Sequence, residues 1–570
     1  MILHSLARYH ERLTEEGGID IAPEGFERKE IPFIITLNED GNFLELLDTR
    51  DGEGKVKRGR IFTVPHSVKK TSGIAANLLW DTPNYVVGIP KLHNADNVKK
   101  YAELAAKQHQ CFITTIKQAC MTCRSDEGIN AVLTYLEKGD FASLLNHPLW
   151  QEAEEKSLNI TFKLDKDDVL VCQRSAVIQV INESISEENT TGYRCLVTGS
   201  LTSPKRLHSA IKGIRGAQSS GANIVSFNLD SFSSYGKKQG MNAPVSSNAE
   251  FAYTTALNHL LSRDSRQKIL IGDATTVFWT AKNHPFENAF FTLFGQDSSK
   301  GDEEQDYKNL IALFRSPESG HKTNISPETK FYVLGLAPNA ARIAVRFWYS
   351  GTVQETAEKI WQHFDDLEIV KGQKEWRTIG LRWLLRATAL QEKDDNIPPN
   401  LAGDTMKAVL NGTPYPRTLL AAAVRRCRAE QSVTYPRAAL IKAVLVRETR
   451  YFQKNTKEVC MSLDISNSNP GYLMGRLFAV LERTQEAANP GINSTIRDRF
   501  YGAASAIPAT AFPQLMKLKN HHISKIDNKG QAVNLERLIG EIIEKITAGE
   551  GFPAHLSLQN QGRFAIGYYH

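Results

Sequence analysis

Hydrophobic and polar positions follow different periods in different parts of the chain. The first sixteen residues place apolar side chains on one helical face, which predicts a helix from Ile2 to about Glu16, and Gly17 and Gly18 are expected to end it. Short apolar runs at 32–37 and 43–47 flank the turn-forming sequence Asn-Glu-Asp-Gly, which predicts a β-hairpin. The chain therefore begins with mixed helix and strand.

The same mixture continues to about residue 390. Residues 96–145 are expected to be mostly helical, and Ser203 followed by Pro204 predicts the start of a short helix that ends near Gly213. Apolar, β-branched or otherwise extended runs predict further strands at 60–64, 161–171, 193–198, 223–227, 268–271, 276–279, 331–336 and 343–348.

The period becomes purely helical after the polar, proline-containing stretch 391–400. Apolar residues in 535–546 recur at helical spacing over three turns, and 437–447 and 472–483 are also predicted helices. We therefore expect an α+β protein, with a large mixed N-terminal body at 1–395 followed by an all-helical C-terminal bundle at 400–570.

Composition excludes several classes of protein. The 570 residues are 41% hydrophobic and 23% charged, as in globular domains, and the length favours two to four domains. A membrane span is not expected, because no run of about 18 apolar residues occurs. Seven cysteines and an N-terminus without an apolar leader segment favour a reducing cytoplasmic location.

Positive charge is concentrated in the last third of the chain. Residues 401–570 contain 22 basic and 13 acidic residues, although the whole chain carries a net charge of only +6. Within 417–450 there are eight basic and two acidic residues, and seven of the eight are arginines, which suit bidentate phosphate contacts. A polyanion partner is one interpretation, and a solvated helix face is the other.

Motifs for catalysis or metal binding are mostly missing. No nucleotide-binding glycine motif, HExxH or GxSxG occurs, and Asp365 and Asp366 after His363 lie at the end of a predicted helix. Cys120 and Cys123 form a CxxC, with His109 and Cys111 upstream. A zinc site normally needs two such pairs, so we favour buried helix cysteines and predict no metal, no cofactor and no enzymatic activity.

One glycine-rich segment, 206–258, combines side chains suited to nucleic acid. Lys237 and Lys238 are suited to phosphate contacts, the amides of Gln239 and Asn242 can contact base edges, and Tyr235 can stack. A flexible surface loop is the alternative. The segment 68–77 has a similar composition, with a turn before the next element as its alternative.

Several segments together resemble the large subunit of the type I-C CRISPR Cascade surveillance complex, the Csd-type family. The most specific is IKGIRGAQSSGANIVSFNLDSFSSYGKKQGMNAPVS from Ile211. The others are MILHSLARYHERL at the start, VKKTSGIAANLLWDTPNYVVG from Val68, FYVLGLAPNAARIAVRFW from Phe331, NGTPYPRTLLAAAVRRCR from Asn411, RFYGAASAIPATAFPQLMKL from Arg499 and QGRFAIGYYH at the end.

The resemblance implies a recognition subunit that does not cut DNA. Such a subunit recognises a protospacer-adjacent motif in double-stranded DNA, helps to open the duplex, supports the displaced strand and helps to recruit a separate nuclease-helicase. The implied partners are CRISPR RNA, target DNA, the backbone and 5′-handle-binding subunits, and a small subunit made from the same gene's C-terminal region, in prokaryotic cytoplasm. Met406 and Met461 are candidate internal starts for that small subunit.

Side-chain chemistry within these segments selects candidate contacts, which the family does not itself assign. For the motif and duplex they are Lys69, Lys70, Asn77, Gln218, Ser219, Ser234, Lys237, Lys238, Gln239 and Asn242. For the displaced strand they are Arg425, Arg426, Arg428 and Arg437. The competing hypotheses are a scaffold subunit without direct DNA contact, which predicts little salt-sensitive binding, and a nuclease with scattered carboxylates, which predicts magnesium-dependent cleavage.

Overall fold

The computed structural model describes residues 1–16, 21–52, 57–68, 70, 73–90, 98–123, 125–187, 192–295, 328–372, 375, 380–398, 400–453, 459–546 and 551–570. They divide into two compact units. Unit 1 comprises Met1–Ser209 and Val225–His259, and unit 2 comprises Ala210–Ile224 and Leu260–His570. This division falls inside the body expected at 1–395, so the boundary at 395–400 stays a prediction. No helix within the described ranges has the length and hydrophobicity that a membrane crossing requires.

Unit 1 contains a four-stranded mixed sheet in the order β3-β2-β6-β5. The strands are β3 (Phe43–Asp48), β2 (Phe33–Leu37), β6 (Ile160–Leu164) and β5 (Trp80–Asp81). β2 pairs antiparallel with β3, which confirms the predicted hairpin, and parallel with β6. All five residues of β2 are buried, because β2 is a central strand whose apolar side chains join the core of this unit.

Helices of unit 1 pack around this sheet and beside a second, smaller layer. The helices of the first group are α2 (Pro83–Val86), α3 (Val98–Ala119), α4 (Glu127–Lys138), α5 (Ala142–Leu145), α6 (Trp150–Glu155) and α7 (Ser175–Glu187). The smaller layer pairs β1 (Phe26–Glu30) with β4 (Ile61–Pro65). The helices predicted within 96–145 and the strand predicted at 60–64 are thus confirmed.

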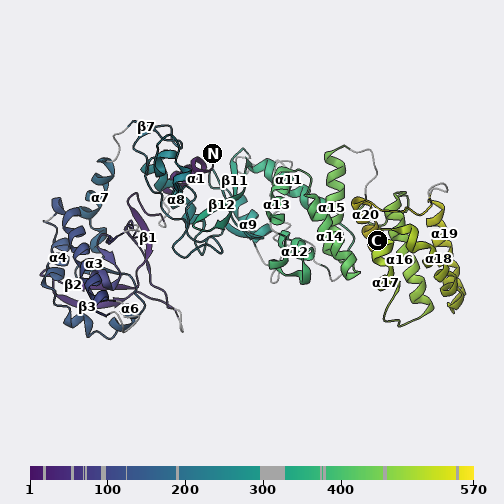
Figure 1. Ribbon diagram of the computed structural model, residues 1–570, viewed down its shortest axis with the longest axis horizontal. Helices are drawn as coiled ribbons and strands as arrows, with labels where there is room; N and C mark the ends of the chain where they lie inside the picture. Colours follow the sequence, from purple (N-terminus) through teal and green to yellow (C-terminus); the bar gives the residue numbers. More distant parts are fainter. Residues whose placement is uncertain are drawn as a thin grey trace. The chain divides into compact units, whose positions relative to one another are not determined.

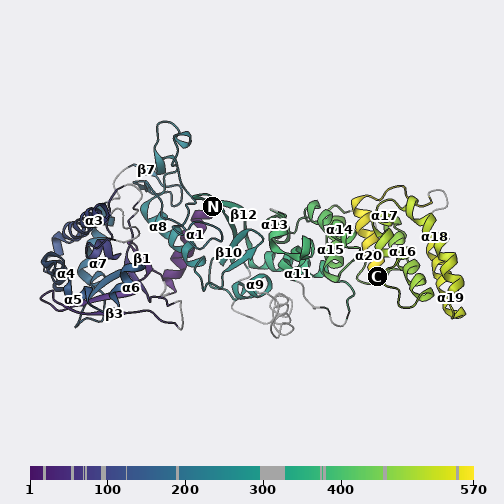
Figure 2. The same cartoon turned by 60° about the horizontal axis from the view of Figure 1, so that its bottom comes forward.

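The predicted N-terminal helix is α1 (Ile2–Glu15), and the glycines expected to end it lie outside the described residues. α1 packs beside α8 (Ser247–Leu260), although more than 200 residues separate them in the chain (Figures 1 and 2). The rings of His10 and Phe251 meet edge to face with centroids 5.5 Å apart. This contact fixes α8, from whose N-terminal side the glycine-rich segment extends.

Two predictions in the glycine-rich segment are wrong. No helix forms at 203–213, because the backbone there makes extended bonds: Lys205 N donates to Val245 O at 2.8 Å, and Ile211 pairs with Ala222. The strand predicted at 223–227 is reduced to an isolated bridge between Asn223 and Arg342. Short strands β7 (Tyr193–Arg194) and β8 (Leu201–Thr202) and the single turns η4 (Asp230–Phe232) and η5 (Gln239–Asn242) are the regular structure between α7 and α8.

Unit 2 contains an antiparallel sheet in the order β12-β11-β10-β9, preceding a long series of helices. Its strands are β9 (Lys268–Ile271), β10 (Ala274–Thr280), β11 (Lys330–Asn339) and β12 (Arg342–Thr352). They confirm the strands predicted in this region. Helix α9 (Phe286–Gly295) covers the sheet through Phe290, whose ring lies 4.6 Å from Phe278 and 5.1 Å from Phe331, centroid to centroid.

The helices of unit 2 after the sheet include all three segments that were predicted as helices beyond residue 400. Their bounds are α11 (Val353–Leu367), α12 (Leu381–Ala387), α13 (Leu401–Asn411), α14 (Arg417–Glu430), α15 (Tyr435–Tyr451), α16 (Pro470–Ala488), α17 (Ile496–Ala504), α18 (Pro508–Lys525), α19 (Lys529–Glu544) and α20 (Leu558–Tyr569). The α+β fold class, with sheets in the N-terminal part and helices in the C-terminal part, is confirmed.

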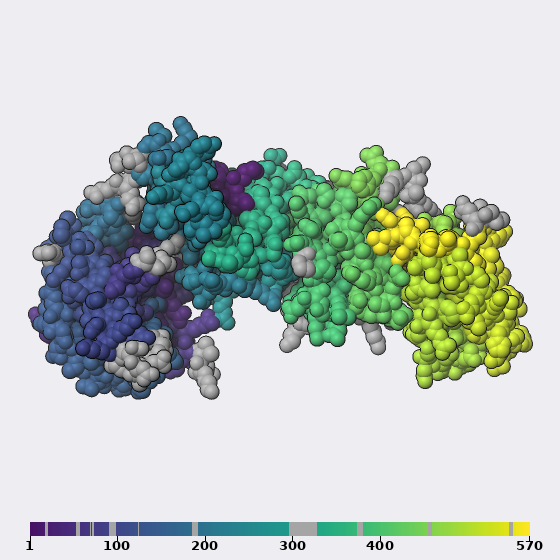
Figure 3. Space-filling model, in the orientation of Figure 1, coloured from purple at the N-terminus to yellow at the C-terminus, as the bar shows by residue number. Residues whose placement is uncertain are grey.

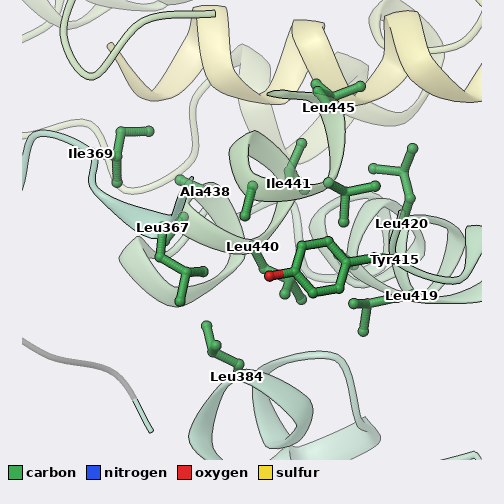
Figure 4. Packing of buried hydrophobic residues seen from close by; sticks show 14 of the residues in the cluster. Leu367, Ile369, Leu384, Tyr415, Leu419, Leu420, Ala438, Leu440, Ile441 and Leu445 are labelled. Carbon is green, nitrogen blue, oxygen red and sulfur yellow. The ribbon is translucent and has the colours of Figure 1, made fainter. Parts of the chain in front are cut away.

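One hydrophobic core runs through unit 2 from the sheet to the last helix. Figure 4 shows part of it, where Leu384 of α12, Tyr415 ahead of α14 and Leu440 of α15 converge. α16 and α20 pack especially closely, since a Cβ added at Gly475 would lie 2.1 Å from Phe564 O. The helical region therefore shares its core with the preceding sheet.

Candidate nucleic-acid interface

A tight turn forms the tip of the 233–242 loop in unit 1. Lys237 N donates to Ser234 O at 3.0 Å, and the two residues between them have positive φ, 53° at Tyr235 and 70° at Gly236. Two successive left-handed residues define the hairpin-type turn that glycine and asparagine normally occupy. Among the described residues, none has an atom within 4 Å of the position that a Cβ on Gly236 would take. The turn therefore projects away from the protein.

Asn242 holds this loop in shape. Its Oδ1 accepts a hydrogen bond from Ser234 N at 2.9 Å, and its Nδ2 donates to the carbonyls of Lys237 and Gln239 at 3.1 and 3.0 Å. The side chain predicted to contact bases thus satisfies three backbone groups of its own loop. It positions the loop, and it has little hydrogen-bonding capacity left for a ligand.

The base of the loop is fixed against Lys205 and Arg206. Gly240 N donates to Arg206 O at 3.0 Å, and a Cβ at Gly240 would lie 2.1 Å from Lys205 O, so only glycine fits there. Arg206 also donates through a guanidinium nitrogen to Gln239 Oε1 at 3.0 Å. Sequence analysis missed Arg206, because the fold alone brings it to a residue 33 positions away.

The remaining polar side chains of the loop face solvent. Ser234, Lys237 and Lys238 are exposed, and within the described residues neither lysine forms an ion pair. Figure 3 shows this part of unit 1, in teal, at the molecular surface. Two unpaired lysines on a rigid turn can contact an anionic backbone without first breaking internal bonds.

Gln218 and Ser219 belong to the short segment of unit 2 that interrupts unit 1. Both side chains are exposed, between the positive-φ glycines Gly216 and Gly221. The structure thus places these two candidates in a different unit from the 233–242 loop. Their shared role stays a prediction.

The second predicted loop is largely occupied by internal contacts. Lys69 lies outside the described residues. Lys70 Nζ donates to both carboxylate oxygens of the buried Asp81 at 2.7 Å and lies 3.6 Å from the ring centroid of Tyr85. Asn77 is buried, and its Oδ1 accepts from Val68 N at 3.0 Å. Asn77 therefore braces the loop and does not face solvent.

The arginines selected for the displaced strand fall into two groups. Arg425 and Arg428 of α14 are exposed, whereas Arg426 is only 15% exposed and pairs with Glu430 at 3.5 Å. Arg437 is buried: it donates to Ala387 O at 2.9 Å and pairs with Glu430. The selection of Arg437 as a surface contact is therefore corrected, because its guanidinium is committed inside unit 2.

Other basic residues counted in 417–450 are also internal. Asp366 is fully buried and accepts from Arg447 at 2.9 Å and from Arg450 at 2.8 Å, while Lys442 Nζ donates to its carbonyl at 3.0 Å. Burial lowers the pKa of Lys442. Burial, with Arg447 nearby, also lowers the pKa of His363 to about 3. We call Asp366, Lys442, Arg447 and Arg450 the Asp366 network. It joins α11 to α15.

The cysteine cluster does not form a ligand set in the structure. Cys123 Sγ contacts Ala176 O at 3.3 Å, and His109 Nδ1 bonds Tyr85 O at 3.0 Å. Cys120 is buried, and desolvation raises its pKa to about 12. Among the described residues no group of three potential ligands lies together.

Comparison with protein-family models matches residues 6–570 to the family described as CRISPR-associated protein (Cas_Csd1). The match covers both units and includes every candidate residue considered above. No curated protein matches the chain.

Proposed function

The chain belongs to the Cas_Csd1 family of CRISPR-associated proteins and is a large subunit of the type I-C Cascade, and from this premise we propose that it recognises the protospacer-adjacent motif in duplex DNA through the 233–242 loop. The observation that carries the proposal is the rigid turn with Lys237 and Lys238 exposed and, among the residues that the structure describes, without an ion pair. A preformed loop binds with a smaller entropic penalty than a flexible one.

In this proposal each loop residue has a defined role. Lys237 and Lys238 contact phosphates, and Ser234 is a further polar contact at the turn. Gln239 offers its amide nitrogen to a base edge, since its oxygen already accepts from Arg206. Asn242 acts indirectly by holding the turn. Gln218, Ser219, Lys69 and Lys70 remain candidate duplex contacts outside the loop.

The helical region would then support the opened duplex. Arg425 and Arg428 are exposed on α14 and suit the phosphates of the displaced strand, with Arg426 beside them. The subunit would work with CRISPR RNA, the backbone and 5′-handle-binding subunits and the small subunit in the cytoplasm. It would help to recruit the nuclease-helicase and would not itself cleave DNA. The target sequence is read by base pairing to the guide.

The test uses the reconstituted RNA-guided complex. Lys237→Ala with Lys238→Ala is compared with Lys99→Ala with Lys100→Ala, an exposed lysine pair in α3 with the same charge loss in the same unit. We expect the loop variant to bind a motif-containing duplex about tenfold more weakly, a loss of about 1.4 kcal/mol, and to keep its affinity for guide-matched single strands.

The control pair should bind both targets like the wild type. Equal binding by the loop variant and the wild type would reject the loop as the site of recognition. A wild-type complex that binds duplexes with and without the motif equally well would favour the scaffold hypothesis. Magnesium-dependent cleavage by the purified subunit would favour a nuclease.

A further inference from the structure

Tyr235 at the tip of the 233–242 loop is 99% exposed. A tyrosine ring normally buries much of its surface in a fold, because removing apolar area from water is favourable. Here the ring gains none of that stabilisation. The folding of unit 1 therefore gives no reason for an aromatic residue at this position.

The backbone conformation at position 235 is also unfavourable for a tyrosine. Tyr235 has φ of 53°, a left-handed conformation that side chains with a Cβ rarely adopt and that asparagine or glycine tolerates better. The turn persists because Asn242 bonds to Ser234 N and to Lys237 O on either side of the tip. Such overdetermined, unfavourable backbone is often found at functional sites.

The surroundings of the ring indicate an anionic partner that offers a flat face. Lys237 and Lys238 follow directly and are exposed, and residues 233–242 contain no Asp or Glu. Aromatic rings flanked by unpaired cations are the recurring arrangement for stacking a nucleobase while its phosphates are neutralised. An acidic protein surface would also match the lysines, so assembly of the complex is one of the outcomes tested below.

We propose that Tyr235 stacks on a nucleobase that is exposed where the target duplex opens beside the motif, and so stabilises the first unpaired step. This inference rests on the proposed function of the loop and adds a separate role to it. The lysines supply attraction to the backbone of any DNA held at the loop. The ring acts only when a base has left its stack, because a paired base inside the duplex has no free face to offer.

Two substitutions distinguish the role of the aromatic ring from that of the turn geometry. Tyr235→Asn keeps the backbone geometry, since asparagine is favoured at this position of such turns, but it removes the ring. Tyr235→Phe keeps the ring and removes the hydroxyl. Tyr101→Ala in α3, where the tyrosine is 39% exposed, serves as the control for loss of a surface tyrosine.

Binding is measured with the reconstituted complex on a fully paired, intact target and on one with an abasic nucleotide at the first position to open beside the motif. Tyr235→Asn should bind the intact target about tenfold more weakly than the wild type, and the abasic target within about twofold of the wild type, because no base is present there to stack on the ring. Tyr235→Phe and Tyr101→Ala should match the wild type on both targets. A 2-aminopurine placed at the first unpaired position should be less quenched with Tyr235→Asn than with the wild type.

Each other outcome overturns the inference. Equal loss on intact and abasic targets would make the ring a general DNA contact, and failure of Tyr235→Asn to assemble would make it a protein contact. Wild-type binding of the paired target by Tyr235→Asn would exclude a role in opening. That last result can occur while the lysine variant still loses motif recognition, so failure of this inference is distinguishable from failure of the proposed function.

Discussion

DNA contacts were predicted both in the 233–242 loop and in the arginine-rich helices α14 and α15. The basic side chains of these two regions differ in how far they are exposed to solvent. Lys237 and Lys238 stay exposed, since the loop is held by the amide of Asn242. In α15, Arg437 and Arg447 are each only 1% exposed and bonded to carboxylates. The exposure of basic side chains, and not their number in the sequence, therefore indicates a polyanion-binding surface.

Removal of the buried Asp366 carboxylate should lower stability the most. Asp366→Ala leaves the buried Arg447 without its partner, and this should lower the free energy of unfolding of unit 2 by about 3–5 kcal/mol. Asp365→Ala, at the exposed neighbouring position, should change it by less than about 0.5 kcal/mol. Denaturant unfolding followed by hydrogen exchange in α11 and α15 measures both. Equal stability of the two variants would contradict an internal role for the arginines.

A second prediction concerns the packing of α16 against α20, the helix whose Gly562 lies against Leu420 of α14 and Ile441 of α15. Gly475→Ala should destabilise unit 2 by about 1–3 kcal/mol, because the added methyl group collides with Phe564 O and α16 must move away from α20. Gly540→Ala in α19, where nothing lies within 4 Å, should stabilise the helix by about 0.5–1 kcal/mol. Thermal unfolding measures the stability of both variants. If Gly475→Ala is stabilising, α16 and α20 do not approach each other as closely at Gly475 and Phe564 as described.

The buried His363, which lies near Arg447, also predicts a pH dependence of stability. His363 is neutral in the folded state, because its pKa is lowered to about 3, while the unfolded chain takes up a proton near pH 6.5. The unfolded state therefore binds more protons, and stability is lost as the pH falls from about 6.5 toward 3, by up to about 1.4 kcal/mol per pH unit. His363→Gln should reduce the slope of stability against pH by the contribution of about one bound proton, which is about 1.4 kcal/mol per pH unit. If the free energy of unfolding of the variant has the same slope between pH 4 and 6 as that of the wild type, His363 does not cause the pH dependence.

The exposed arginines of α14 should contribute a smaller, salt-dependent effect. Arg425→Ala with Arg428→Ala should reduce the slope of log K against log salt for single-stranded DNA by about 1.4, or 0.7 for each phosphate contact. Arg483→Ala with Arg537→Ala removes two exposed arginines that pair with Glu486 and Glu541, and it should leave the slope unchanged. Equal slopes for the two double variants, measured on the reconstituted complex, would mean that α14 is not a strand-binding surface.

Sequence patterns predicted the helices and strands better than they predicted the burial and contacts of individual side chains. The hairpin at 33–48, the four strands of unit 2 and α15, α16 and α19 follow directly from hydrophobic periodicity. The segment 203–227 was predicted wrongly, because several of its backbone hydrogen bonds are made to distant residues such as Val245, Ala341 and Ile343. Local propensity contains no information about such distant partners.

The candidate site shows the same limit at the level of single residues. An amide at 77 and an amide at 242 look equally suited to base contacts, yet Asn77 is buried and Asn242 bonds to its own loop. Arg206 was missed because it meets Gln239 only in the folded chain. Residue type predicts what a side chain can bind, whereas the fold decides whether a partner is already present.

Hydrogen exchange on the reconstituted complex tests the central claim, that accessible charge on the 233–242 loop serves motif recognition. Amides of residues 233–242 and of α14 are compared in complexes bound to matched targets with and without the motif, and to DNA-free complex. We predict motif-dependent protection of the loop, and protection of α14 whenever a displaced strand is present, whichever motif flanks it. Loop protection that is absent, or identical with and without the motif, would contradict the account.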